Sequence, residues 1–168
     1  MVLSRMLLSA VCGTAVALAT PGVATAATTY TDSVYGFEYS ATSTQGKFTG
    51  TAYGALPGAW AATVNHEVLN PSGAVTGGDM SLATALTGTP TLVDGDVTGG
   101  AVTRNNLGST GCVNQYYGVY LTLGNVTANG AGNWWGSFGG TLTHHRRSVF
   151  GTCVTYSATI NGTLTVSF

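Results

Sequence analysis

The alternation of apolar and small polar residues between Trp134 and Phe168 is the feature that most constrains the fold. Thr, Ser and Gly recur there between Trp, Phe, Leu, Ile and Val. Successive side chains of a β-strand point to opposite faces, so this rhythm predicts strands with one apolar face and one hydroxyl-rich face. Asn161-Gly162 stands between two such runs. Because both residues tolerate a positive φ, we expect a hairpin turn there.

Earlier segments of the chain show the same two-residue period. We expect strands over Tyr30–Thr42, Gly46–Tyr53, Ala59–Val68, Val75–Leu86, Leu92–Arg104 and Val113–Val126, and three more in the segment 134–168. Turn residues such as Pro57-Gly58 and Asn129-Gly130 separate them. Eight or nine strands without a helical pattern predict an all-β fold. A single antiparallel up-and-down β-barrel is the first choice, and a β-sandwich is the second.

The first 26 residues differ in character from the rest. Arg5 precedes an apolar run from Met6 to Leu18, and Ala24-Thr25-Ala26 matches the small-residue pattern of a signal-peptidase site. The apolar run is shorter than a helix needs to span a bilayer. We therefore expect a secretory signal peptide over 1–26, a secreted protein without a membrane span, and one β domain over 27–168.

Charged residues make up only 7% of the chain. Without Arg5, four Lys and Arg remain against six Asp and Glu, which gives the segment 27–168 a net charge of −2 with His neutral. Because there is no basic excess, nucleic acid is not expected as a partner. The abundance of Thr, Ser, Asn and Gly is typical of extracellular β proteins.

Cys112 and Cys153 are the cysteines of the segment 27–168. An even pair in a secreted chain predicts one disulfide, and the wide spacing without a CxxC motif disfavours a metal-binding or redox pair. In an up-and-down meander both residues begin strands that run in the same direction. We therefore expect them at the same end of the barrel. Closing a loop of about 40 residues stabilises a fold by roughly 3–4 kcal/mol through loop entropy.

His66 and His144 fall on the apolar faces of their predicted strands. A buried histidine needs hydrogen-bond partners and changes its charge near neutral pH. The two rings either form a hydrogen-bonded part of the core or rim, or contact a ligand or act as acid and base inside the barrel. No third metal ligand is evident, so no metal site is predicted. Arg146 lies in the run 144–147, which either holds an anionic group or forms a solvated strand end.

Large aromatic residues occur on both faces of the predicted strands. Trp60 and Trp134 lie on the apolar face, whereas Tyr116, Tyr120 and Trp135 lie on the polar face. Aromatic rings on a polar face predict a stacking surface for sugars or a partner, unless a loop covers them. The candidate ligand-binding residues are thus Trp60, His66, Tyr116, Tyr120, Trp134, Trp135, His144 and Arg146.

Motifs of catalysis and cofactor binding are scarce. The sequence holds no Gly-x-Ser-x-Gly motif, P-loop or dinucleotide fingerprint, and no cofactor is predicted. Size and strand pattern resemble small secreted barrels such as the lipocalin-like, streptavidin-like and allene-oxide-cyclase-like folds, which is a likeness of architecture. The first hypothesis is a non-catalytic extracellular module that binds an apolar small molecule or a glycan. The alternatives are a cyclase- or isomerase-like barrel enzyme that uses His66 or His144, and a structural or adhesive coat protein.

Overall fold

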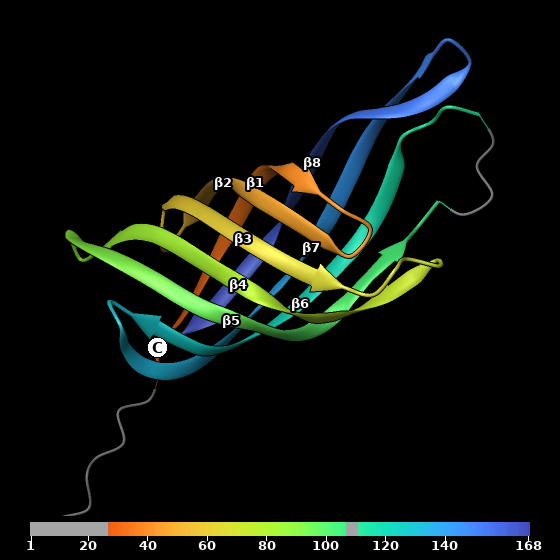
Figure 1. The fold of residues 1–168 in the computed structure, drawn as a ribbon. Helices are drawn as coiled ribbons and strands as arrows, with labels where there is room; N and C mark the ends of the chain where they lie inside the picture. Colours follow the sequence, from red (N-terminus) through yellow and green to blue (C-terminus); the bar gives the residue numbers. More distant parts are fainter. Residues whose placement is uncertain (1–26, 107–110) are drawn as a thin grey trace, which may run out of the picture.

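The protein is a closed β-barrel of eight antiparallel strands in the described part of the chain, in which each strand pairs with the next and β8 returns to β1 (Figure 1). The computed structural model describes residues 27–106 and 111–168, so the predicted signal peptide lies outside the described residues. The strands are β1 (Thr29–Ala41), β2 (Gln45–Gly54), β3 (Gly58–His66), β4 (Ser72–Leu86), β5 (Thr89–Arg104), β6 (Gln115–Ala128), β7 (Ala131–Val149) and β8 (Thr152–Ser167). The prediction of an up-and-down barrel is confirmed.

The hairpin predicted at Asn161-Gly162 is wrong. β8 continues through both residues, and Gly162 lies opposite Gly140 of β7. Gly162 is a packing position and not a turn, because a Cβ atom there would lie 2.7 Å from Phe138 Cε2. The Phe138 ring therefore rests against a stretch of wall that carries no side chain.

The turn that joins β7 to β8 is formed by Phe150-Gly151 instead. Their φ angles are 50° and 80°. Two consecutive positive φ values are those of a type I′ turn, the type whose twist matches the flanking strands. The final segment of the chain therefore contributes two long strands where three shorter ones were expected.

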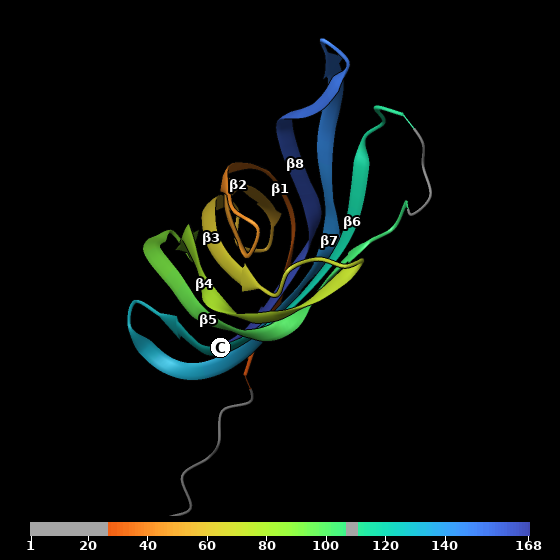
Figure 2. The same ribbon diagram turned by 45° about the vertical axis from the view of Figure 1, so that its right-hand side comes forward.

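The two ends of the barrel differ. The connections β1–β2, β3–β4, β5–β6 and β7–β8 gather at one end, which we call the mouth. β7 has 19 residues whereas β3 has 9, and Figures 1 and 2 show β6, β7 and β8 continuing past the shorter strands at this end. We call this raised side, formed by residues 115–118, 143–149 and 152–158, the high wall.

The closed end is sealed by residues from a loop and both ends of the domain. Leu56, in the β2–β3 connection, is completely buried, and its main-chain N–H donates a hydrogen bond of 2.8 Å to Asp32 Oδ1. The Phe168 ring stacks on Tyr30 and also contacts Trp134, with ring centroids 4.8 Å and 5.8 Å apart. These contacts fill the end of the barrel opposite the mouth.

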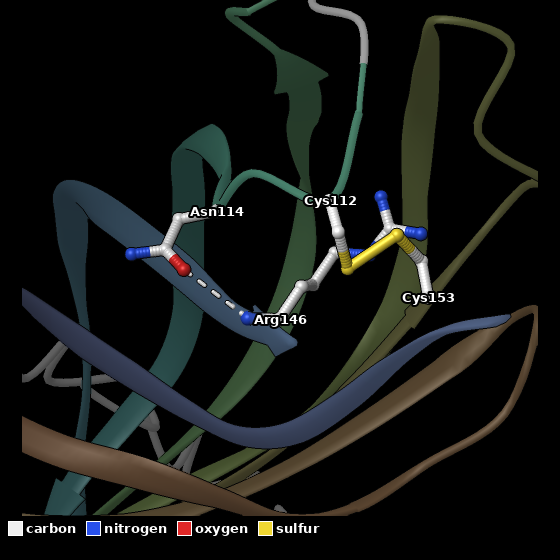
Figure 3. Close-up of a disulfide and its surroundings, with 4 residues drawn as sticks. All are labelled: Cys112, Asn114, Arg146 and Cys153. Atoms are coloured by element: carbon white, nitrogen blue, oxygen red, sulfur yellow. Dashed lines mark hydrogen bonds between the residues drawn. A yellow bond between two sulfur atoms is a disulfide. The ribbon is translucent and has the colours of Figure 1, made fainter. Parts of the chain in front are cut away.

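The predicted disulfide between Cys112 and Cys153 is confirmed. Its Cα atoms are 5.4 Å apart, and it joins the β5–β6 connection to the start of β8 (Figure 3). Both cysteines lie at the mouth end, as the meander predicts. The bond ties a long connection to the high wall, and it is compatible with an extracellular location.

Gly162 and Gly139 provide a matched test of the packing argument. A Cβ atom at Gly139 would meet nothing within 4 Å, whereas one at Gly162 would press on the Phe138 ring. We expect Gly162→Ala to lower the free energy of unfolding by about 1–3 kcal/mol, the usual cost of overpacking. Gly139→Ala should change it by about 0.5 kcal/mol or less. Urea unfolding curves of the two variants provide the measurement, and an equal loss in both would contradict the argument.

Candidate functional site

A cavity of about 310 Å³ opens at the mouth and occupies the upper half of the barrel. Its lining comes from the inward-facing residues of the strands, and most of them are apolar: Val34, Phe48, Trp60, Ala62, Val64, Met80, Val102, Val119, Leu121, Phe138, Leu142 and Ile160. Leu82 and Leu164, the cross-strand neighbours of Trp60 and Phe138, are core residues outside this lining. The Trp60 and Phe138 rings therefore form the floor of the cavity.

The Trp60 ring can lie against the barrel wall because Gly36 has no side chain. A Cβ atom at Gly36 would be 2.7 Å from Trp60 Cζ2. The indole N–H donates a 3.3 Å hydrogen bond to the main-chain oxygen of Tyr35, so its one polar atom is satisfied. The floor is thus apolar toward the cavity.

Glu38 and His144 form a hydrogen bond inside the cavity. Glu38 Oε2 lies 3.1 Å from His144 Nε2, and both residues belong to the lining. They come from β1 and β7, which β8 separates. The residue that β8 places opposite His144 is Ala158, whose methyl group leaves room for the two longer side chains to meet. Among residues 27–106 and 111–168, no other acidic and basic side chains lie within salt-bridge distance of each other.

Two arginines on the same side of the mouth share a neutral partner. The Gln115 amide oxygen accepts hydrogen bonds from Arg146 Nη1 at 3.0 Å and Arg104 Nη2 at 3.1 Å. The amide is oriented in this way because its NH₂ group would otherwise face only donors. Its nitrogen then donates to the Tyr117 hydroxyl at 3.0 Å. Within the described residues, neither guanidinium has a carboxylate within salt-bridge distance.

These polar residues form one continuous group, which we call the rim cluster: Glu38, Arg104, Gln115, Tyr117, His144 and Arg146. The strand register places Tyr117 beside Arg104 and Gln115 beside His144. The Tyr117 and His144 rings lie 5.0 Å apart. Because both also line the cavity, they form the boundary between its apolar interior and the two arginines.

Burial raises the pKa of the Tyr117 hydroxyl above its ordinary value of 10.0. The positive charges of Arg104 and Arg146 act in the opposite direction, and the charge of Glu38 raises the pKa further. Tyr117 is therefore a neutral hydrogen-bonding group at physiological pH.

His66 reaches the cavity from the side of the mouth opposite the high wall. It lies at the end of β3, and its Nδ1 donates a 2.7 Å hydrogen bond to the main-chain oxygen of Glu67. His145 points away from the cavity, since its Nε2 lies 3.0 Å from Thr159 Oγ1 and its ring lies 6.2 Å from that of Tyr156. His66 and His144 thus share the cavity, and His145 does not take part.

The structure divides the predicted ligand-binding residues among three places. Trp60, His66 and His144 line the cavity, and Arg146 lies beside it in the rim cluster. Trp134 packs at the closed end against Phe168. The remaining three are on the outer surface, with exposed fractions of 43% for Tyr116, 54% for Tyr120 and 59% for Trp135. One site does not hold all eight.

Four residues of the rim cluster were not predicted from the sequence: Glu38, Arg104, Gln115 and Tyr117. Each occupies a position whose side chain points into the barrel. Glu38 is four residues after the buried Val34, and the other three are likewise an even number of residues from buried residues of their strands. A charged or amide side chain at an inward position of an otherwise apolar strand is the signal that identifies them. To use that signal, one must know which residues of each strand point inward. The turn residues give only the approximate ends of the strands, so they do not settle this.

Comparison with known proteins returned no match to a family model, a curated protein or a solved structure. In the part of the chain that the structure describes, no helix is long and apolar enough to cross a membrane. Nor do residues 27–106 and 111–168 hold a group of three or more His, Cys, Asp or Glu side chains that could bind a metal ion.

The raised pKa of Tyr117 predicts a loss of stability at alkaline pH. The unfolded chain loses this proton near its ordinary pKa of 10.0, before the folded chain does. The contribution of Tyr117 is therefore fully present below pH 10 and is lost as the pH rises through the higher folded value. Tyr117→Phe should flatten this part of the stability profile, measured by urea unfolding between pH 8 and 11. An unchanged slope would show that Tyr117 is not its source; Tyr120→Phe, on the outer surface, is the control.

Proposed function

We propose that the protein is a secreted, non-catalytic binder that takes a small and mainly apolar molecule into its barrel. The observation that carries the proposal is the open cavity of about 310 Å³. Protein interiors are normally packed as densely as organic crystals, and empty spaces much larger than a water molecule are uncommon. Ligand pockets typically have volumes of a few hundred Å³ and an apolar lining.

The lining supports a small molecule over a glycan as the occupant. Most of the residues that line the cavity are apolar, and the polar ones gather at the mouth. A ligand would gain about 25 cal/mol for each Å² of apolar surface that it buries. The volume corresponds to about ten water-sized groups, at roughly 30 Å³ each. A chain or ring system of about that many carbon atoms fits this description, with any polar group directed to the mouth.

Secretion is supported by two independent features. The leader over 1–26 has the charge, apolar run and small residues of a signal peptide. The disulfide between Cys112 and Cys153 is compatible with an oxidising compartment.

A second candidate function is acid–base catalysis within the same cavity. The contact between Glu38 and His144 favours it, because a carboxylate that orients a histidine is a common arrangement in enzymes. Tyr117 adds a neutral proton donor beside the same ring. A cyclase or isomerase would need little more than an enclosed substrate and such a group.

Binding and catalysis can be distinguished by the compound that co-purifies with the protein. We expect solvent extracts of the purified protein and of its Glu38→Gln variant to contain the same compound by mass spectrometry, because a binder does not change its ligand. If the variant instead retained a compound that the unaltered protein converts to another, the enzyme would be the correct function. Thermal melting of both proteins controls for folding.

Straight-chain alcohols provide a direct test of the apolar cavity. We expect the affinity to rise about fourfold for each added methylene, at about 0.8 kcal/mol each. The rise should stop at about ten carbon atoms, when the cavity is full. Titration calorimetry with hexanol to dodecanol measures both quantities, and an affinity independent of chain length would contradict the proposal.

A cavity-filling variant locates the binding. Ala62 is buried and lines the cavity, whereas Ala59 is exposed on the outer face of the same strand. Ala62→Phe should weaken decanol binding tenfold or more, since the added ring, about six carbon atoms, takes up much of the space. Ala59→Phe should leave it unchanged. Equal effects of the two substitutions would place the binding outside the barrel.

A further inference from the structure

In the part of the chain that the structure describes, the two arginines of the rim cluster have no carboxylate partner. Arg104 and Arg146 are both half-buried, and both donate to one amide oxygen. Arg104 Nε is fully buried and has no hydrogen-bond partner among residues 27–106 and 111–168. An Arg guanidinium presents five donors in a planar fork that matches a carboxylate, so a single neutral oxygen uses little of its capacity.

Their position is set by the same strands that build the cavity. Arg104 is two residues beyond the buried Val102 on β5 and pairs with Tyr117, which lines the cavity. Arg146 is two residues beyond His144 on β7 and reaches the same Gln115 oxygen. A molecule whose apolar part fills the cavity would therefore present its outer end to these two guanidinium groups.

We propose that the ligand is an amphiphile with a carboxylate head group, which Arg104 and Arg146 bind at the mouth while the apolar part fills the cavity. This inference rests on the proposed function. Each oxygen of the carboxylate accepts from one or both guanidinium groups and displaces the Gln115 amide oxygen. Charge-assisted bonds of this kind are about twice as strong as neutral ones.

Glu38 is the one feature of the rim that favours a cationic head group instead. Its carboxylate, however, is largely buried and already contacts His144 at 3.1 Å. An amine would have to compete with that histidine for Glu38, and it would also lie near two positive charges. A carboxylate meets two guanidinium groups that share an uncharged amide oxygen as their acceptor.

Decanoate, decanol and decylamine share one apolar chain and separate these possibilities. Titration calorimetry at pH 7.5, below the critical micelle concentrations, should give decanoate an affinity at least tenfold higher than that of decanol, with decylamine the weakest. Decanol binding that equals or exceeds decanoate binding would overturn the carboxylate and leave the proposed function standing. Tighter binding of decylamine than of decanoate would likewise overturn the carboxylate, and it would indicate a cationic head group bound by Glu38. If none of the three binds, the proposed function fails as well.

Three variants assign the head group to its site. Arg104→Gln and Arg146→Gln should each lower decanoate affinity about tenfold and leave decanol affinity unchanged. Arg147→Gln removes the same charge from an exposed side chain that lies over the Tyr156 ring, 5.4 Å from its centroid, and should have little effect. If Arg147→Gln weakens decanoate as much as the other two, the preference reflects net charge and the proposed site is wrong.

Gln115→Glu tests the site without removing an arginine. The new carboxylate would occupy the place proposed for that of the ligand. We expect decanoate affinity to fall to the level of decanol, while decanol still binds and the melting temperature does not fall. Decanoate that keeps its full advantage in this variant would overturn the proposal.

Discussion

The contact between large inward rings and glycines in the barrel wall determines where the core ends and the cavity begins. An eight-stranded barrel has an interior only just wide enough for its side chains. Phe138 lies against Gly162 and Gly140, and Trp60 lies against Gly36, so both rings fit without pushing the strands apart. Below them, aliphatic side chains and Leu56 fill the closed end. Above them the lining includes smaller residues such as Ala62, Val64 and Val119, and a cavity of about 310 Å³ remains.

Polar residues inside a barrel must be satisfied by one another, and here neighbouring strands supply the partners. Glu38 reaches His144 only because Ala158 on the strand between them is small. Arg104, Arg146 and Tyr117 all depend on the Gln115 amide. Strands β5, β6 and β7 carry most of this network at the mouth, and the disulfide joins Cys112 to the start of β8 at the same end. The change from an apolar to a polar lining is therefore produced by residues of the barrel strands.

The two-residue period was sufficient to predict the barrel and the inward face of β3, where Trp60, Ala62 and Val64 are buried. It also placed both cysteines at one end. It could not show that Gly162 is a packing glycine, because that role depends on a ring from another strand, whereas Asn-Gly is locally a good turn. The rim cluster was missed for a similar reason. Its contacts join four strands, β1, β5, β6 and β7, and their register depends on bulges that the period does not encode.

The rim also indicates how such a barrel could select among amphiphiles of equal length. A polar group that already has a fixed side-chain partner gains little from a ligand, because the new bond replaces one of similar strength. Glu38 is in that position, since it contacts His144. The two guanidinium groups share one uncharged oxygen, and exchanging it for a carboxylate strengthens both bonds. On the proposal made above, selectivity therefore arises from how well each group is satisfied in the empty protein. A simple count of charges at the mouth would not distinguish Glu38 from the two arginines in this respect.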